Sequence, residues 1–170
     1  MTEIAHIKVV WITVLKLATA NPSIQIIWHC YDANGEQIAG YGGRWYCEYA
    51  QMSVARKALV TAWLADLRVK AIWLVRNTDV NAMPESTVTI HSVDMARYTD
   101  TSVGVSVIKD YGEGEEFSGQ LLYAQGENGG MLMNHRIPVV TEIAAQIVTQ
   151  VNAWLTLAEQ IVWKLRVDRI

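Results

Sequence analysis

The chain has 170 residues, of which 51% are hydrophobic and 18% are charged, and its formal net charge is −3. This composition suits one compact domain with a real core and excludes long disordered segments. The charge balance does not predict nucleic-acid binding, and no uninterrupted apolar run reaches the roughly 18 residues of a membrane span. The apolar run near the N-terminus resembles a signal peptide, but Glu3 and Lys16 interrupt its pattern, so we expect a cytoplasmic protein.

The first half of the sequence predicts three strands, a helix and a strand. Apolar and polar residues alternate through 24–31, and "DANG" offers Asn34 and Gly35 for a tight hairpin turn. Residues 50–67 have apolar positions at helical spacing. The predicted elements are strands 7–17, 24–31 and 36–47, helix 50–67 and strand 69–75.

The second half predicts the same order of elements. Pro138 stands where the first turn of a helix would accept it, and the apolar positions from Ile143 to Ala158 form a clear helical stripe. The polar stretch 77–86 links the halves. The predicted elements are strands 87–98, 103–108 and 116–123, a helix from residue 138, and strand 161–167.

Two pairs of segments match in the same order. The turn "YDANGEQIAGYGG" matches "KDYGEGEEFSGQL", and "VTAWLADLRVKAIWLVR" matches "VNAWLTLAEQIVWKLR", which pairs Trp63 with Trp154 and Trp73 with Trp163. The alternative explanation is that hairpin turns and amphipathic helices look alike. We expect an α+β fold of two tandem βββαβ units, residues 1–80 and 87–170, duplicated and packed about a pseudo-twofold axis in one compact domain.

An insertion at 125–137, "QGENGGMLMNHRI", distinguishes the second unit from the first. Its centre holds Met131, Leu132 and Met133 in a glycine-rich loop. Methionine surfaces adapt to partners, so contact with another protein is one expectation. Packing of the loop against the protein's own core is the other.

The stretch "YGGRWYCEY" concentrates aromatic side chains around an arginine. Tyr, Trp and Arg dominate interface hot spots, and aromatic rings also stack single-stranded bases. The same residues could simply cover a sheet. The predicted interface residues of this stretch are Tyr41, Arg44, Trp45, Tyr46 and Tyr49.

Cys30 and Cys47 lie on neighbouring predicted strands. They could form a cross-strand disulfide or stay as two buried thiols, and a reducing compartment favours the thiols. The histidines and cysteines show no metal-binding spacing, so we expect no metal or other cofactor.

Three carboxylates of the second unit suggest an alternative chemistry. Asp100 follows its first strand, Glu142 lies at the start of its helix, and Asp168 ends its closing strand. This order of elements resembles the first part of a ribonuclease H-like fold, whose carboxylates at these points hold divalent ions for phosphodiester cleavage. The resemblance implies a catalytic set of Asp100, Glu142 and Asp168 with Mg²⁺. Otherwise Glu142 favours a helix N-terminus and the aspartates are solvated strand ends.

The main functional prediction is a non-catalytic structural or interaction protein. It would be a homo-oligomeric subunit of a larger assembly, such as a phage particle or assembly component, that binds itself or other protein subunits and neither membrane nor nucleic acid. The nuclease, or an inactive relative of it, is the alternative. A small-ligand site at the seam between the two units is the third prediction.

Overall fold

A computed structural model describes residues 3–78, 88–99, 101–110, 118–124, 129–132 and 137–167. Eight strands and two long helices make up the described chain, with one short 3-10 helix, Tyr49–Gln51. The strands are β1 His6–Leu15, β2 Ser23–Tyr31, β3 Gln37–Glu48, β4 Thr89–Thr99, β5 Ser102–Asp110, β6 Ser118–Ala124, β7 Gly130–Leu132 and β8 Ile137–Val139, and the helices are α1 Val54–Thr78 and α2 Thr141–Val167.

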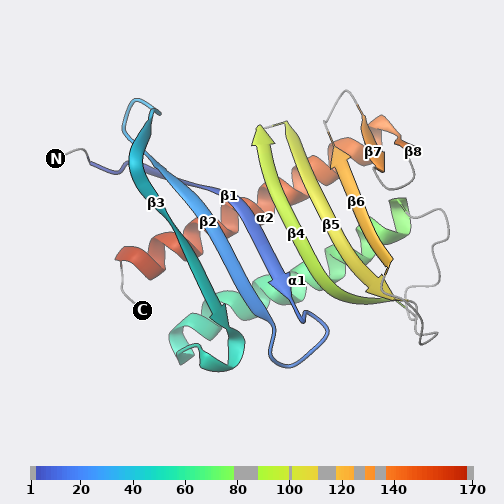
Figure 1. Cartoon of the computed structure of the whole chain (residues 1–170), viewed down its shortest axis with the longest axis horizontal. Coiled ribbons are helices and arrows are strands. Elements are labelled where there is room, and N and C mark those ends of the chain that lie inside the picture. Colours follow the sequence, from blue (N-terminus) through green and yellow to red (C-terminus); the bar gives the residue numbers. More distant parts are fainter. Residues whose placement is uncertain are drawn as a thin grey trace.

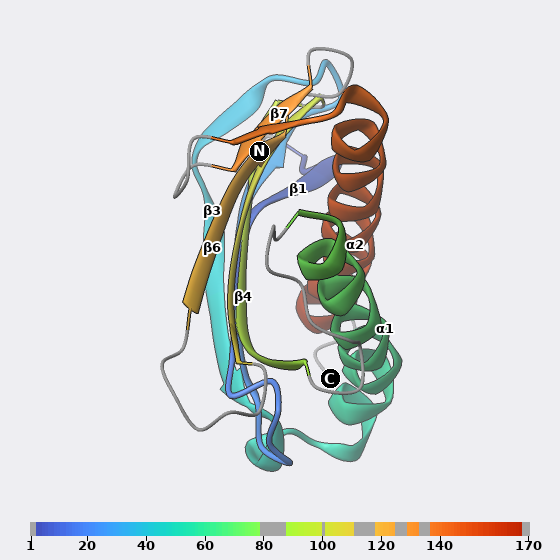
Figure 2. The same cartoon turned by 90° about the vertical axis from the view of Figure 1, so that its right-hand side faces the viewer.

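All eight strands belong to one antiparallel sheet, in the order β3-β2-β1-β4-β5-β6-β7-β8. Both long helices cover the same face of this sheet (Figure 2). The α+β fold class predicted from the sequence is therefore confirmed.

The core lies between the helices and the covered face of the sheet. Alternate residues of each strand point toward the helices, because side chains in a strand alternate between its two faces. Ile12 at the centre of β1 is fully buried and stands between Ile26 of β2 and Met95 of β4. Leu67 of α1 and Leu155 of α2 are fully buried in the same cluster.

The element order βββα occurs in each half of the chain, with two additional strands before α2. The halves join where β1 pairs with β4, over Trp11–Val14 and Val93–Ala96. The first strand of each half is thus central, and the second and third strands follow outward on either side (Figure 1). This arrangement is the one a pseudo-twofold axis would produce, while descent from one duplicated unit stays a prediction.

The strands predicted to close each unit are wrong. Residues 69–75 continue α1, and residues 161–167 continue α2. A short apolar run does not distinguish a strand from a buried part of a helix. In α1 the buried positions Ala71, Leu74 and Val75 follow helical spacing, whereas Val69 is exposed. Each unit is therefore βββα.

The start of each helix also differs from its prediction. In α1, Ser53 precedes the first residue, and its Oγ accepts a hydrogen bond from the backbone N of Arg56 at 3.3 Å. That contact is a typical N-cap. Pro138 lies in β8 and not in a helix, since α2 begins at Thr141. β8 is an edge strand, where a missing N–H donor is tolerated.

Cys30 and Cys47 are buried free thiols. They lie on the neighbouring strands β2 and β3 but are not opposite each other. Cys47 of β3 pairs with Ile24 of β2, and Cys30 of β2 pairs with Ile7 of β1. The disulfide is therefore not formed. Within the described residues, neither helix has the length and hydropathy needed to cross a bilayer.

Candidate interaction surface on the open face of the sheet

Both long helices lie on one side of the sheet, and we call the opposite face the open face (Figure 2). Strand register defines its residues, because side chains directly opposite each other lie on the same face. Two rows cross the sheet from β3 to β5. They are Tyr46–Gln25–Thr13–Asp94–Ser106 and Arg44–Ile27–Trp11–Ala96–Gly104.

Three aromatic side chains in or beside these rows are exposed. Trp11 is 42% exposed, Tyr46 is 55% exposed and Tyr98 is 61% exposed. Leu15 and Ile108 are also exposed at the ends of the neighbouring strands. The open face therefore combines several large apolar groups over the width of five strands, which is unusual for a surface that only meets water.

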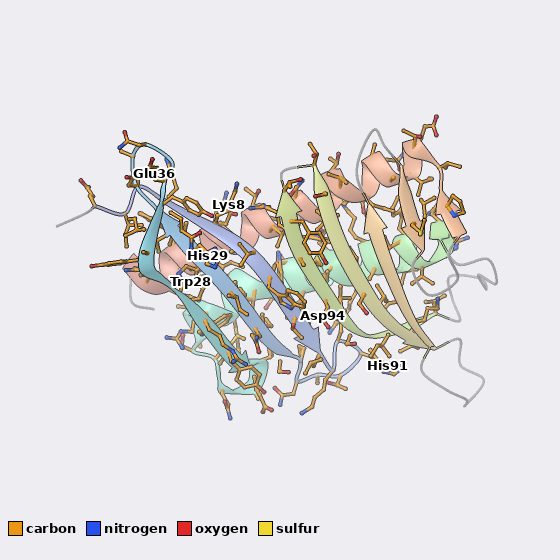
Figure 3. All side chains as sticks on the ribbon, turned by 45° about the horizontal axis from the view of Figure 1, so that its top comes forward. Lys8, Trp28, His29, Glu36, His91 and Asp94 are labelled. Carbon is orange, nitrogen blue, oxygen red and sulfur yellow. The ribbon has the colours of Figure 1, made fainter. Side chains whose placement is uncertain are left out.

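A polar cluster fixes Trp11 at the centre of the open face. The indole Nε1 of Trp11 donates to Oγ1 of Thr13 at 3.0 Å and to Oδ1 of Asp94 at 3.2 Å. The Thr13 hydroxyl also donates to Oδ1 of Asp94. Asp94, which Figure 3 labels, lies on β4 and Trp11 lies on β1, so the cluster links the two halves of the chain. A ring held in this way loses little rotational freedom when a partner covers it.

Tyr98 lies over Gly104 on the adjacent strand. A Cβ at Gly104 would stand 2.9 Å from the Tyr98 hydroxyl oxygen, so the glycine makes room for the ring. A shallow depression of about 130 Å³ lies between Tyr98 and Trp11, with Asp94 on its wall. Its size suits one side chain of a partner and not a cofactor.

The predicted aromatic cluster of β3 divides between the two faces. Arg44 and Tyr46 lie on the open face, where Nη2 of Arg44 donates to Oε1 of Gln25 at 2.8 Å. Trp45 and Tyr49 are partly buried and pack against the core, so they cover the sheet. Tyr41 is exposed near the other end of β3.

The predicted insertion is only partly a loop. Met131 and Leu132 belong to β7, which pairs with β6, and Ile137 begins β8. Met131 is exposed. Met133 lies outside the described residues.

Of the three carboxylates of the predicted nuclease site, the structure describes one. Glu142 is exposed in the first turn of α2, while Asp100 and Asp168 lie outside the described residues. The strand expected to lead to Asp168 is helical. Among the described residues, no three His, Cys, Asp or Glu side chains are grouped so that they could hold a metal ion. The order of elements that suggested a ribonuclease H-like fold is therefore not the order observed.

Sequence reasoning missed Trp11, Asp94 and Tyr98. The alternation within 7–17 and 87–98 shows which residues share a face, but it does not say which face the helices cover. In the sequence Trp11 is in phase with Val9, so alternation assigns both to one face. The register irregularity between them places them on opposite faces in the structure.

Comparison of the chain with known protein families, with curated proteins and with solved structures gave no match.

Proposed function

We propose that this protein is a non-catalytic subunit of a homo-oligomeric assembly, and that copies of the chain bind one another through the open face. One observation carries the proposal: both helices cover one face of the sheet, while the other face exposes Trp11, Tyr46 and Tyr98. A sheet buries its apolar face against another layer, and a second copy would supply that layer here.

The composition of the open face suits a protein interface. Aromatic and arginine side chains carry most of the binding energy at interfaces, and Trp11, Tyr98 and Arg44 are of these types. The hydrogen-bonded cluster around Asp94 holds Trp11 in place before binding. The conformational entropy lost on binding is then smaller than for a free side chain.

The charges of the open face favour a second copy as the partner. Register places charges of both signs on the open face, among them Lys8, Arg44, Glu48 and Asp94. Two such faces can meet without net repulsion, and each offers both signs to the other. A nucleic acid would instead favour an excess of cations.

This function agrees with a place in a particle assembled in the cytoplasm, such as a phage particle, and it requires no cofactor. Exposed Met131 on β7, next to the edge strand β8, would extend the contact surface toward a neighbouring subunit. Binding to a different protein subunit would use the same face.

Light scattering coupled to size-exclusion chromatography tests the proposal. We expect a mass above that of the single chain that rises with concentration. The double variant Trp11→Lys/Tyr46→Lys should remain a monomer, because it places charge at the centre of the apolar surface. The matched control is Trp163→Lys/Leu157→Lys, which changes exposed apolar residues of α2 on the other side of the molecule. A wild-type chain that stays monomeric at all concentrations, or equal loss of mass in both variants, would contradict the proposal.

A further inference from the structure

The two halves of the sheet separate along part of their seam. Among the described residues, β1 pairs with β4 only over Trp11–Val14, so the part of β1 before Trp11 has no ladder with β4 (Figure 1). A register irregularity between Val9 and Trp11 marks the point of separation. It interrupts the strand just where the two halves stop pairing.

A side chain of the second half accepts a hydrogen bond from a backbone N–H of β1 that does not pair with β4. The backbone N of Val9 donates to Oε1 of Glu159 on α2 at 3.0 Å. The same Oε1 accepts a hydrogen bond from Nη1 of Arg97 on β4 at 2.8 Å. Nε of Arg97 donates to Oδ1 of Asn152, also on α2, at 3.2 Å. These bonds do not use Nη2 of Arg97.

An opening of about 550 Å³ lies beside this cluster. His6, Lys8 and Tyr31 line it from the first half, and Arg97, Asn152 and Glu159 line it from the second. The hairpin turn at Gly35 closes one side. This volume is within the range of sites that bind small organic molecules.

A purely structural explanation of the cluster is weak. The Arg97 side chain is only 8% exposed and that of Glu159 only 21%. Removing two such charges from water costs about as much free energy as their attraction returns, so continued pairing of β1 with β4 would hold the sheet together at least as well. Polar groups from two halves that converge on one opening are instead typical of a binding site.

The charges around the opening select the class of ligand. Arg97 and Lys8 are cationic, whereas Glu159 is the one carboxylate among the described residues that line it. Glu159 is already bonded to Arg97 and to the Val9 backbone. A guanidinium and an ammonium at one wall suit a phosphate or carboxylate group.

We propose that the seam between β1 and β4 is a binding site for a small organic anion, whose phosphate or carboxylate group contacts Arg97 and Lys8. The ligand would join the two halves of the sheet where their backbones part. Binding would therefore stabilise the folded chain, since an unfolded chain has no such site.

Isothermal titration calorimetry at fixed ionic strength tests this site with four probes: inorganic phosphate, AMP, citrate and, as a neutral comparison, adenosine. We expect heat of binding and a raised Tm with at least one of the anions, and neither with adenosine. A preference for phosphate and AMP would assign a phosphate ligand, and a preference for citrate would assign a carboxylate. Either result supports the proposal.

Two variants that leave the Arg97–Glu159 pair intact make the test specific. Lys8→Gln removes a cation from the wall, and Thr156→Phe places a ring at a residue of α2 that lines the opening. Each should weaken anion binding about tenfold or more, which corresponds to at least about 1.4 kcal/mol.

Matched controls are available for both. Thr149→Phe changes a threonine of the same helix whose hydroxyl makes the same type of bond, to the carbonyl four residues earlier, outside the opening. Lys70→Gln removes a cation from α1. No binding of any of the three anions at concentrations up to about 10 mM, several times a millimolar Kd (about −4 kcal/mol), would overturn the proposal. Equal binding to wild type and Thr156→Phe would overturn it as well.

Discussion

Trp63 and Trp154 meet between the two helices: the indole Nε1 of Trp63 donates to the backbone oxygen of Trp154 at 3.4 Å. Both residues are buried, and Nε1 of Trp154 in turn donates to Oδ2 of Asp66 on α1 at 2.8 Å. These two tryptophans are the pair that the internal sequence match aligns. Equivalent residues of two related units meet where a twofold axis passes, so their contact supports the predicted duplication.

The tryptophan contact predicts a large effect of truncation. We expect Trp154→Ala to lower the free energy of unfolding by about 3–5 kcal/mol, because it removes a buried ring and leaves a cavity. Trp163→Ala on the same helix should cost much less, since Trp163 is 41% exposed. Urea denaturation followed by circular dichroism measures both. Similar losses for the two variants would contradict the packing described between α1 and α2.

Glycines beneath aromatic rings give a second prediction. A Cβ at Gly43 would overlap the indole of Trp28, coming within 2.9 Å of its Cε2. Because Trp28 packs against the core, it cannot move freely, and we expect Gly43→Ala to destabilise the fold by about 1–3 kcal/mol. Gly104→Ala should cost less, since the Tyr98 ring above it is exposed and can shift. Thermal unfolding of both variants checks the order, and the reverse order would be evidence against these contacts.

The ion pair between Arg97 and Glu159 at the seam gives a third prediction. Glu159→Leu would leave the guanidinium of Arg97 and the backbone N of Val9 without their shared acceptor. We expect a loss of stability of about 3 kcal/mol, because an uncompensated charge remains in a mostly buried position. The double variant Arg97→Met/Glu159→Leu should recover part of it. Chemical denaturation of the three proteins measures the difference, and a double variant less stable than Glu159→Leu would argue against the pairing.

The two cysteines predict slow thiol chemistry. Cys30 and Cys47 are free and buried, so a thiol reagent should react with neither at an appreciable rate in the folded protein and with both after unfolding in guanidinium. Reaction with Ellman's reagent measures this directly. A mass increase of two hydrogens on reduction would instead reveal a disulfide.

Much of the sheet follows from sequence alone, and the reasons are local. Alternation in residues 24–31 and the "DANG" turn place β2 and the start of β3 closely. The ends of the helices were missed because a short run such as "VKAIWLV", apolar except for Lys70, fits a buried strand as well as a buried part of a helix.

The open face was harder to predict because it depends on which face of the sheet the helices cover, and not on a sequence motif. Arg44 and Tyr46 were identified by residue type, and register places them on the open face. Trp45 lies between them in sequence but points to the covered face, where it packs on the core. The position of the helices decides between these outcomes, and alternation within a strand does not say which face they cover.

The seam also depends on contacts between distant residues. Arg97 and Glu159 are far apart in sequence, and the packing of α2 against the sheet brings them together. The sequence predicted a site between the two units but offered no means of naming these side chains.

Hydroxyl-radical footprinting tests the open face most directly. Trp11 on the sheet and Trp163 on α2 have nearly equal exposure, 42% and 41%, so their oxidation rates in the isolated chain should be similar. We predict that raising the protein concentration protects Trp11 and leaves Trp163 unchanged. Protection of Trp163 with Trp11 still reactive would show that assembly uses the helical side, and the proposed interface would be wrong.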